Sequence, residues 1–135
     1  MSVREFRAAH AMGASVEREA LVARDGFSAR YDLDRIRGVF CRPQHRLAGE
    51  SYVGRILVLD TAKGGVASAW MLHEMKSRGI VPLAFVFNSV NPIIAQGTAF
   101  ADLPMLAGFE CDITAELATG DRLRLEPAEG VLRRL

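Results

Sequence analysis

Two nearly uninterrupted apolar runs lie in the middle of the chain, and a stretch with helical features separates them. The first run falls in a predicted strand at Arg55–Leu59, and the second forms a predicted strand at Ile80–Phe87. Continuous apolar runs of this length predict strands that are covered on both faces. The stretch between them predicts a helix that begins near Val66 and ends at Gly79, a residue suited to the left-handed cap position. A right-handed crossover then makes the two strands parallel.

The predicted helix gathers apolar residues roughly on one side, as amphipathic helices do. The residues on that side are Val66, Ala69, Trp70 and Met75. Trp70 therefore belongs either to the core or to a subunit interface, whereas His73 is expected at the surface.

The segments before the first run alternate between polar and apolar positions. Ser15–Ala23 predicts a strand with mixed burial, and a turn pair at Asp25-Gly26 stops it. Phe27–Asp34 has period-two alternation, which predicts a half-buried strand or an extended arm. The proline and polar residues of Gly38–Gly49 predict a loop or an edge segment. Residues 1–12 are expected to form an N-terminal extension, and residues 13–135 a single domain.

Shorter elements follow the second run. Asn91-Pro92 predicts a second helix, with Asn91 as N-cap and proline at the first helical position. The remaining expectations are a helix break at Gly97, a short strand at Leu103–Leu106, a helical turn within Asp112–Ala118, a strand with one solvated face at Arg122–Leu125, and one more hairpin strand before Leu135. The chain as a whole predicts an α/β fold.

Composition narrows the class of protein. The 135 residues are 50% hydrophobic, enough for one domain with a real core, and the formal net charge is +1. Because the basic residues are scattered, a nucleic-acid partner is not expected. No apolar run is long enough for a membrane span and the N-terminus lacks a signal-peptide core, so no membrane partner and a cytoplasmic location are expected.

The two cysteines stand far apart and predict neither a disulfide nor a zinc site. Cys41 and Cys111 each lack a CxxC partner or a nearby histidine pair. Cys41 is interpreted either as a small buried hydrophobic residue or as a ligand or reactive thiol. The chain alone is therefore expected to bind no metal.

The main candidate site is the turn at Gly64-Gly65, between the first buried strand and its helix. A helix start presents unpaired backbone N–H groups and the positive end of the helix dipole, which suits a carboxylate or phosphate. Lys63 adds a cation beside the turn, so Lys63, Gly64 and Gly65 are candidate substrate-binding residues. The alternative is that two glycines only make a tight turn.

Four further residues are candidates, each with a structural alternative. Ser68 is a candidate acid–base residue or a serine that bonds its own backbone. His45, between Arg42 and Arg46, is the best titratable candidate or a solvated loop histidine. Arg30 is a possible second carboxylate anchor or one member of an exposed pair with Asp32. Asn88 follows a strand, at the sheet edge where ligands bind in open α/β sheets, and is a candidate binding residue. The alternative is that it only stabilises the turn.

The order of these motifs resembles the small swivel domain of the aconitase X family. The resemblance covers roughly Gly13 to Pro127 and is most specific in two stretches. These are GVFCRPQHRLAGESYVGRILVLDTAKGG at residues 38–65, and GIVPLAFVF at residues 79–87 with the later NPIIAQG. The resemblance implies a swivelling β/β/α domain: a partly parallel, barrel-like or sandwich β core with two or three helices.

The resemblance also implies a function. Members of the family are hydro-lyases that dehydrate small hydroxy acids, with cis-3-hydroxy-L-proline and 5-phosphomevalonate as substrate types. This implies that the chain is the small subunit of an iron-dependent dehydratase, inactive alone, and we expect the hydroxyproline-like substrate. An iron or iron–sulfur centre would be held by a separate large catalytic subunit.

One departure from the family pattern bears on the chemistry. Many members have Arg-Gly-Ser at the turn, with the serine taken to act at the reaction centre, whereas this chain has Lys63-Gly64-Gly65. Ser68 is then the nearest hydroxyl. The alternative to a dehydratase subunit is a non-catalytic swivel-type module that binds a small anion or a protein partner.

Overall fold

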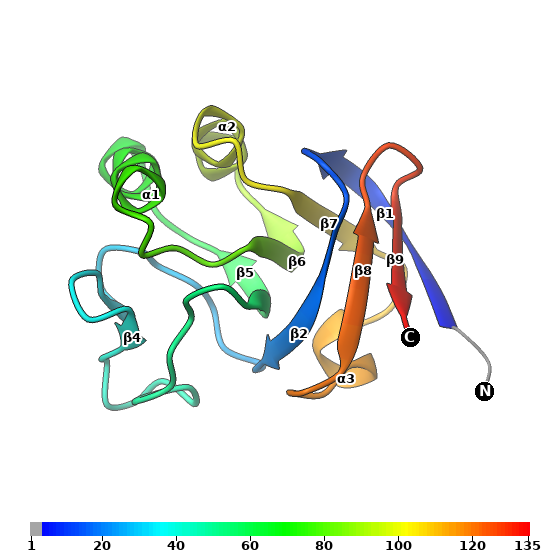
Figure 1. Ribbon diagram of the computed structural model, residues 1–135, viewed down its shortest axis with the longest axis horizontal. Coiled ribbons are helices and arrows are strands. Elements are labelled where there is room, and N and C mark those ends of the chain that lie inside the picture. Colours follow the sequence, from blue (N-terminus) through cyan, green and yellow to red (C-terminus); the bar gives the residue numbers. More distant parts are fainter. Residues whose placement is uncertain (1–3) are drawn as a thin grey trace.

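A closed seven-stranded barrel forms the body of the computed structural model, which describes residues 4–135 (Figure 1). Its strands are β1 (Arg4–Met12), β2 (Val16–Val22), β5 (Ile56–Ala62), β6 (Ala84–Val90), β7 (Met105–Phe109), β8 (Arg122–Glu126) and β9 (Val131–Arg134). Around the barrel they follow the order β1-β7-β6-β5-β2-β8-β9, and β9 pairs with β1 to close the ring. A small separate hairpin joins β3 (Leu33–Asp34) to β4 (Val39–Phe40).

One part of the barrel is parallel and the rest is antiparallel. Strands β2, β5, β6 and β7 pair in parallel, with Ile56 opposite Ala84 between β5 and β6. The other four pairings, which involve β1, β8 and β9, are antiparallel. The predicted parallel strand–helix–strand unit is confirmed. The predicted α/β class with a partly parallel, barrel-like core is also confirmed, and the sandwich alternative is wrong.

Three helices cover the barrel. Helices α1 (Val66–Arg78) and α2 (Pro92–Phe100) lie side by side over the outer face of the parallel strands, and α3 (Ile113–Glu116) lies at one end (Figure 1). Helix α1 ends as predicted at Gly79, whose φ of 74° is left-handed. Asn91 caps α2 as predicted, because its side chain accepts a hydrogen bond from the Ile94 N–H at 2.8 Å.

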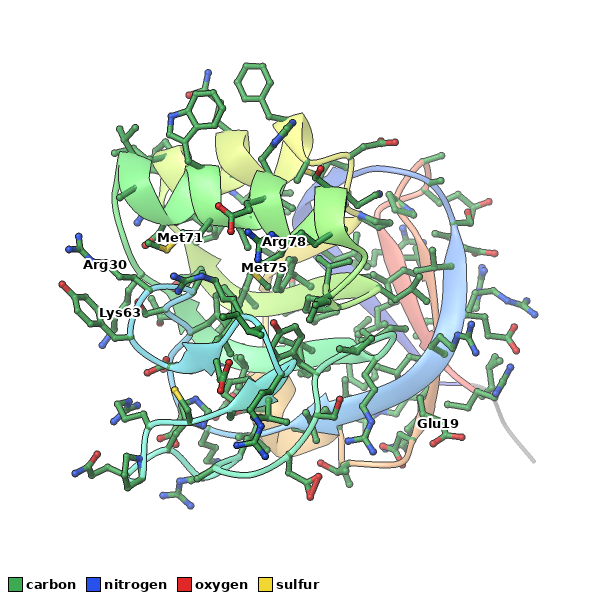
Figure 2. All side chains as sticks on the ribbon, turned by 60° about the vertical axis from the view of Figure 1, so that its left-hand side comes forward. Glu19, Arg30, Lys63, Met71, Met75 and Arg78 are labelled. Atoms are coloured by element: carbon green, nitrogen blue, oxygen red, sulfur yellow. The ribbon has the colours of Figure 1, made fainter. Side chains whose placement is uncertain are left out.

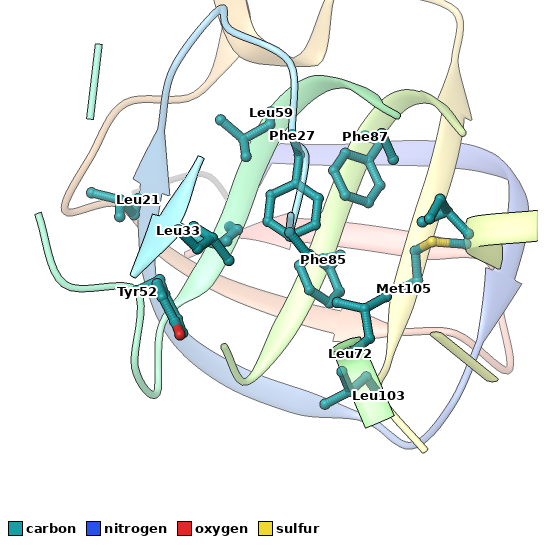
Figure 3. Packing of buried hydrophobic residues seen from close by; sticks show 14 of the residues in the cluster. Leu21, Phe27, Leu33, Tyr52, Leu59, Leu72, Phe85, Phe87, Leu103 and Met105 are labelled. Atoms are coloured by element: carbon teal, nitrogen blue, oxygen red, sulfur yellow. The ribbon is translucent and has the colours of Figure 1, made fainter. Parts of the chain in front are cut away.

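Strand alternation creates two cores on opposite faces of the parallel strands. In β5, Ile56 and Val58 face the barrel interior, where all seven strands contribute apolar side chains and α3 adds Ile113. Leu57 and Leu59 face outward into a second core beneath α1 and α2. Figure 3 shows this outer core around Phe27, Phe85 and Phe87, whose ring centroids lie 5.2 to 5.9 Å apart. Burial on both faces explains why this strand is apolar without alternation.

Two predictions before β5 are wrong. Residues 4–12 are strand β1 of the barrel and not an extension, while residues 1–3 lie outside the described part of the chain. Strand β1 has no regular pattern of buried residues from which it could be predicted, because Phe6 is its one buried residue. Phe27–Asp34 is mostly turns rather than a strand, because Asp32 folds back and accepts a hydrogen bond from the Ser28 N–H at 2.9 Å.

Two predictions about the helices are also wrong. Gly97 does not break α2; it allows α2 to approach α1, since a Cβ at Gly97 would lie 2.5 Å from the Ala69 Cβ. The buried face of α1 carries Ser68, Leu72 and Met75, whereas Val66 and Trp70 are exposed. The interpretation of Trp70 as a core residue is therefore wrong, and its interpretation as a subunit-interface residue stays a prediction. No helix within residues 4–135 is both long and apolar enough to cross a membrane.

Candidate functional site

The turn between β5 and α1 is open to solvent and depends on glycine at one position. Gly64 has φ 126°, and a Cβ there would lie 2.5 Å from the Ser68 Oγ. Both facts exclude an ordinary side chain at Gly64. Gly65 has φ −113°, and a Cβ there would meet no atom within 4 Å. Lys63, Gly64 and Gly65 are all exposed, so a ligand has access to the turn.

Helix α1 begins without a side-chain cap. Gly65 is its N-cap residue, no side-chain hydrogen bond caps it, and the first turn contains no acidic residue. The first N–H groups of a helix have no partner within the helix, and the dipole places partial positive charge there. The start of α2 differs, because Asn91 caps it. The start of α1 is therefore the one of these two helix ends that is available to an anion.

Hydrogen bonds hold the turn on two sides. The Asn91 Nδ2 donates to the Gly64 carbonyl at 3.0 Å, which links the turn to the start of α2. On the other side, the Lys63 N–H donates to the Phe27 carbonyl at 2.8 Å, and the Phe27 N–H donates to the Thr61 carbonyl at 2.8 Å. The turn is therefore positioned before any ligand binds, which lowers the entropic cost of binding.

Lys63 supplies an available positive charge beside the turn. Its side chain passes over Gly26, where an added Cβ would lie 3.3 Å from the Lys63 Cε. Within residues 4–135, no carboxylate lies within 4.0 Å of its ammonium group. In Figure 2, Arg30 and Lys63 project at the same edge of the molecule. Arg30 is exposed, and the central carbon of its guanidinium lies 5.4 Å from the centroid of the Tyr31 ring.

The expected pair of Arg30 and Asp32 is absent from the described contacts. Asp32 is buried and pairs with Arg42, whose Nε donates to its carboxylate at 2.6 Å. A buried carboxylate needs such a partner, because burial without one is costly. The prediction of an exposed Asp32 is therefore wrong, and Arg30 remains free to meet an anion.

His45 is buried, so the alternative of a solvated loop histidine is wrong. Its Nδ1 accepts a hydrogen bond from the Leu47 N–H at 3.0 Å, which places the proton on Nε2. The Nε2–H then donates to the Gly26 carbonyl at 3.0 Å, and the ring stacks on Phe40 with centroids 4.7 Å apart. Both ring nitrogens are thus engaged. His45 supports the Gly26 loop, over which Lys63 lies, and does not itself face the turn.

Ser68 lies beneath the turn, in the first turn of α1. Its side chain is buried, and its hydroxyl is the atom that a Cβ at Gly64 would meet. The structure therefore places the Ser68 hydroxyl against Gly64, and the predicted acid–base role of Ser68 stays a prediction. Cys41 is exposed, which excludes its interpretation as a buried hydrophobic residue.

Asn88 serves the other face of β6 and anchors α3. Its Nδ2 donates to Asp60 at 2.9 Å and to Asp112 at 2.8 Å, and its Oδ1 accepts from the Ile113 N–H at 2.8 Å. Asp112 caps α3, and hydrogen bonds from Thr114 and then Asn88 lower the pKa of its carboxyl. All the side-chain hydrogen bonds of Asn88 within residues 4–135 go to this cluster, and none links it to the glycine turn.

Asn91, and not Asn88, is the asparagine that contacts the turn. The sequence identified Asn91 only as a helix cap. Its donor group remains available because the cap uses the side-chain oxygen and leaves Nδ2 free to reach the Gly64 carbonyl. This contact could have been predicted from the parallel pairing of β5 with β6, because that pairing brings the carboxyl ends of both strands to one edge of the sheet.

No metal centre is built from residues 4–135. No group of three or more His, Cys, Asp or Glu side chains in that part of the chain could hold an ion. The described residues therefore do not fit an iron or iron–sulfur centre, and we derive no step through one.

We predict that the two glycines of the turn differ in how strongly their substitution lowers stability. Gly64→Ala should lower the free energy of unfolding by about 2 to 4 kcal/mol, because the side chain combines a disfavoured φ with a clash against Ser68. Gly65→Ser should change it by no more than about 0.5 kcal/mol, since serine is a favourable N-cap residue. Urea denaturation of both variants tests this geometry, and equal losses would contradict it.

Comparison with known proteins identifies the family. The model of the aconitase X swivel domain matches residues 5–134. Among curated relatives, the phosphomevalonate dehydratase small subunit of Methanopyrus kandleri is 36% identical over 112 residues, covering 83% of each chain. The protein of the same description from Pyrococcus horikoshii is 30% identical, covering 85% of this chain and 84% of the relative.

Solved structures share the fold. The holo-form of aconitase X from Thermococcus kodakaraensis superposes with a TM-score of 0.90 and covers 98% of both chains at 24% identity, a likeness of fold alone. A solution structure described as a UPF0107 protein gives a TM-score of 0.85 at 28% identity, covering 98% of this chain and 99% of the other. With nearly the whole chain matched by the family model, this protein belongs to the aconitase X swivel-domain family.

Proposed function

We propose that this chain is the small subunit of a hydro-lyase that dehydrates a small hydroxy acid together with a separate large catalytic subunit. The observation that supports this most directly is the uncapped start of α1 beside the unpaired Lys63. Two relatives at least 30% identical are described as small subunits of phosphomevalonate dehydratase. A cytoplasmic location is part of the proposal.

The turn would anchor one anionic group of the substrate. The start of α1 and Lys63 both belong to the exposed turn, and backbone N–H groups together with a lysine suit a carboxylate or phosphate. Arg30 is proposed as a second anchor, because its planar guanidinium can bind a carboxylate through two hydrogen bonds. His45 and Asn88 would act indirectly, since their polar atoms hold the Gly26 loop and α3.

The substrate is proposed to be a phosphorylated hydroxy acid of the 5-phosphomevalonate type. The descriptions of the relatives favour it over a cis-3-hydroxy-L-proline-like acid, which the sequence had suggested first. Because of one residue at the turn, the experiment also includes the cis-3-hydroxy-L-proline-like acid. Gly65 stands where many members of the family carry a serine, and a changed residue at the turn is compatible with a changed substrate.

The remaining chemistry is assigned to the large subunit. An iron or iron–sulfur centre is proposed to belong to that subunit, because the described residues of this chain do not fit one. This chain would orient the substrate anion and take part in moving the proton that is lost from the neighbouring carbon. Ser68 is the proposed proton-transfer group in this chain. Lys63 and the helix dipole favour the ionised form of a hydroxyl placed close to the turn.

A non-catalytic binding module is the second candidate. The observation that favours it is Gly65 itself, which leaves the exposed part of the turn without a hydroxyl. Such a module would bind the same anion or the same partner and would not contribute to turnover.

We predict that Lys63→Met raises the KM of the assembled enzyme. The two subunits of one organism are co-expressed without oxygen, and the loss of water from 5-phosphomevalonate and from cis-3-hydroxy-L-proline is measured. Turnover should require both chains. Lys63→Met should raise KM by about tenfold with a smaller change in kcat, because one charged hydrogen bond is lost.

Arg78→Met is the matched control, because Arg78 lies in the last turn of α1, at the opposite end of the helix from the glycine turn, and pairs at the surface with Glu74. It should leave KM unchanged. Absence of dehydration of both acids by the assembled complex would contradict the proposal, and so would full turnover by the isolated small subunit or by the isolated large subunit.

Substitution of Ser68 separates the two candidate functions. Ser68→Ala should lower kcat by about a hundredfold or more if this hydroxyl transfers the proton. The substituted side chain is smaller and fits the site, so circular dichroism should show a folded protein. Wild-type kcat in Ser68→Ala, with the complex intact, would exclude Ser68 from proton transfer and favour the binding module.

A further inference from the structure

An apolar groove runs between α1 and α2 on the outer surface of the protein. Its volume is about 290 Å³, and it is lined by Val66, Ala69, Trp70, His73, Ile93, Gln96, Gly97 and Phe100. None of these lining residues is an acid, a lysine or an arginine. The groove is therefore an uncharged surface, in a protein whose residues are 24% charged.

Large apolar side chains are concentrated at this groove. Trp70 is 68% exposed and Phe100 is 74% exposed, while Val66 and Ile93 are 62% and 42% exposed. They are four of the eight large apolar residues that are exposed within residues 4–135. Exposed apolar residues that stand singly are ordinary, but a contiguous patch marks an interaction surface.

The two helices are closely packed where Gly97 and Ala69 line the groove. Gly97 of α2 lies so close to α1 that an added Cβ would meet the Ala69 Cβ at 2.5 Å, which fixes the two helices against each other. The Trp70 ring also lies edge-on to His73, with centroids 6.1 Å apart. A partner can therefore dock without first rearranging the helices, which reduces the cost of binding.

We infer that this α1–α2 groove docks an apolar, uncharged segment of the large catalytic subunit. Continuity with the candidate site carries the argument. Val66 follows directly after Gly65, and Ile93 lies in the first turn of α2, whose cap residue Asn91 contacts Gly64. A subunit that completes the site over the glycine turn also reaches the near end of the groove.

This inference rests on the proposed function, because that function requires a large subunit over the turn. The aromatic side chains give the groove the composition of an interface centre, where Trp and other large residues contribute most of the affinity. The polar turn beside it would bind substrate. One continuous face would thus combine an apolar docking area with the ligand-binding turn.

The test measures affinity between the two purified subunits by calorimetry, without a requirement for turnover. Trp70→Ala and Phe100→Ala should each raise Kd by about tenfold or more. Val53→Ala and Ile36→Ala are matched controls, because these side chains are 43% and 76% exposed but lie outside the groove. The controls should change Kd by less than about twofold. Thermal unfolding verifies that all four variants fold.

Turnover at saturating small subunit provides a second readout. The groove variants should then recover wild-type kcat and KM, because neither Trp70 nor Phe100 is part of the turn. Unchanged Kd in both groove variants, while the wild-type subunits bind each other, would overturn the docking inference and leave the proposed function standing.

Two other outcomes have distinct meanings. If the wild-type subunits do not bind, both the docking inference and the proposed function fail. If sedimentation shows a homodimer that Trp70→Ala dissociates while the affinity for the large subunit is unchanged, the groove is occupied by a second copy of this chain and the inference is overturned.

Discussion

Parallel pairing of β5 with β6 is the constraint on which the arrangement of the site depends. Because the two strands run in the same direction, their carboxyl ends meet at one edge of the sheet, and the helices that follow both begin there. The Asn91 side chain then joins the two helix starts through the Gly64 carbonyl. The barrel fixes the strands, so the buried core also fixes the position of the turn.

The same sheet separates two groups of polar residues, one on each of its faces. Asn88, Asp60 and Asp112 lie on the face of the sheet that leads into the barrel, where their hydrogen bonds attach α3 over one end. The glycine turn lies on the side of the outer helices and remains exposed. The first group is satisfied within the chain, whereas the turn has an unpaired cation and an uncapped helix start. That difference is why we propose the turn, and not the Asn88 cluster, as the binding surface.

Local patterns predicted most of the fold. Buried runs, the glycine cap of α1 and the Asn-Pro start of α2 act through their immediate neighbours, so they can be read directly from the sequence. Strand β1 could not be recognised, because its pairing is with strands that follow about a hundred residues later. The burial of Asp32 and His45 was missed for a similar reason, since it depends on contacts between separate loops. The exposed face of α1 was misassigned because Val66 and Trp70 are apolar, and apolar residues of a core and of an interface look alike in a sequence.

The central claim is that the start of α1 and the neighbouring groove form one face that a partner subunit completes. Amide hydrogen exchange of the free chain and of the two-subunit complex tests it most directly. Peptides covering residues 63–70 and 93–100 should exchange at least about tenfold more slowly in the complex, whereas exchange of the α3 peptide over residues 112–117 should be unchanged. Equal exchange of residues 63–70 in the free chain and in an intact complex would contradict the account.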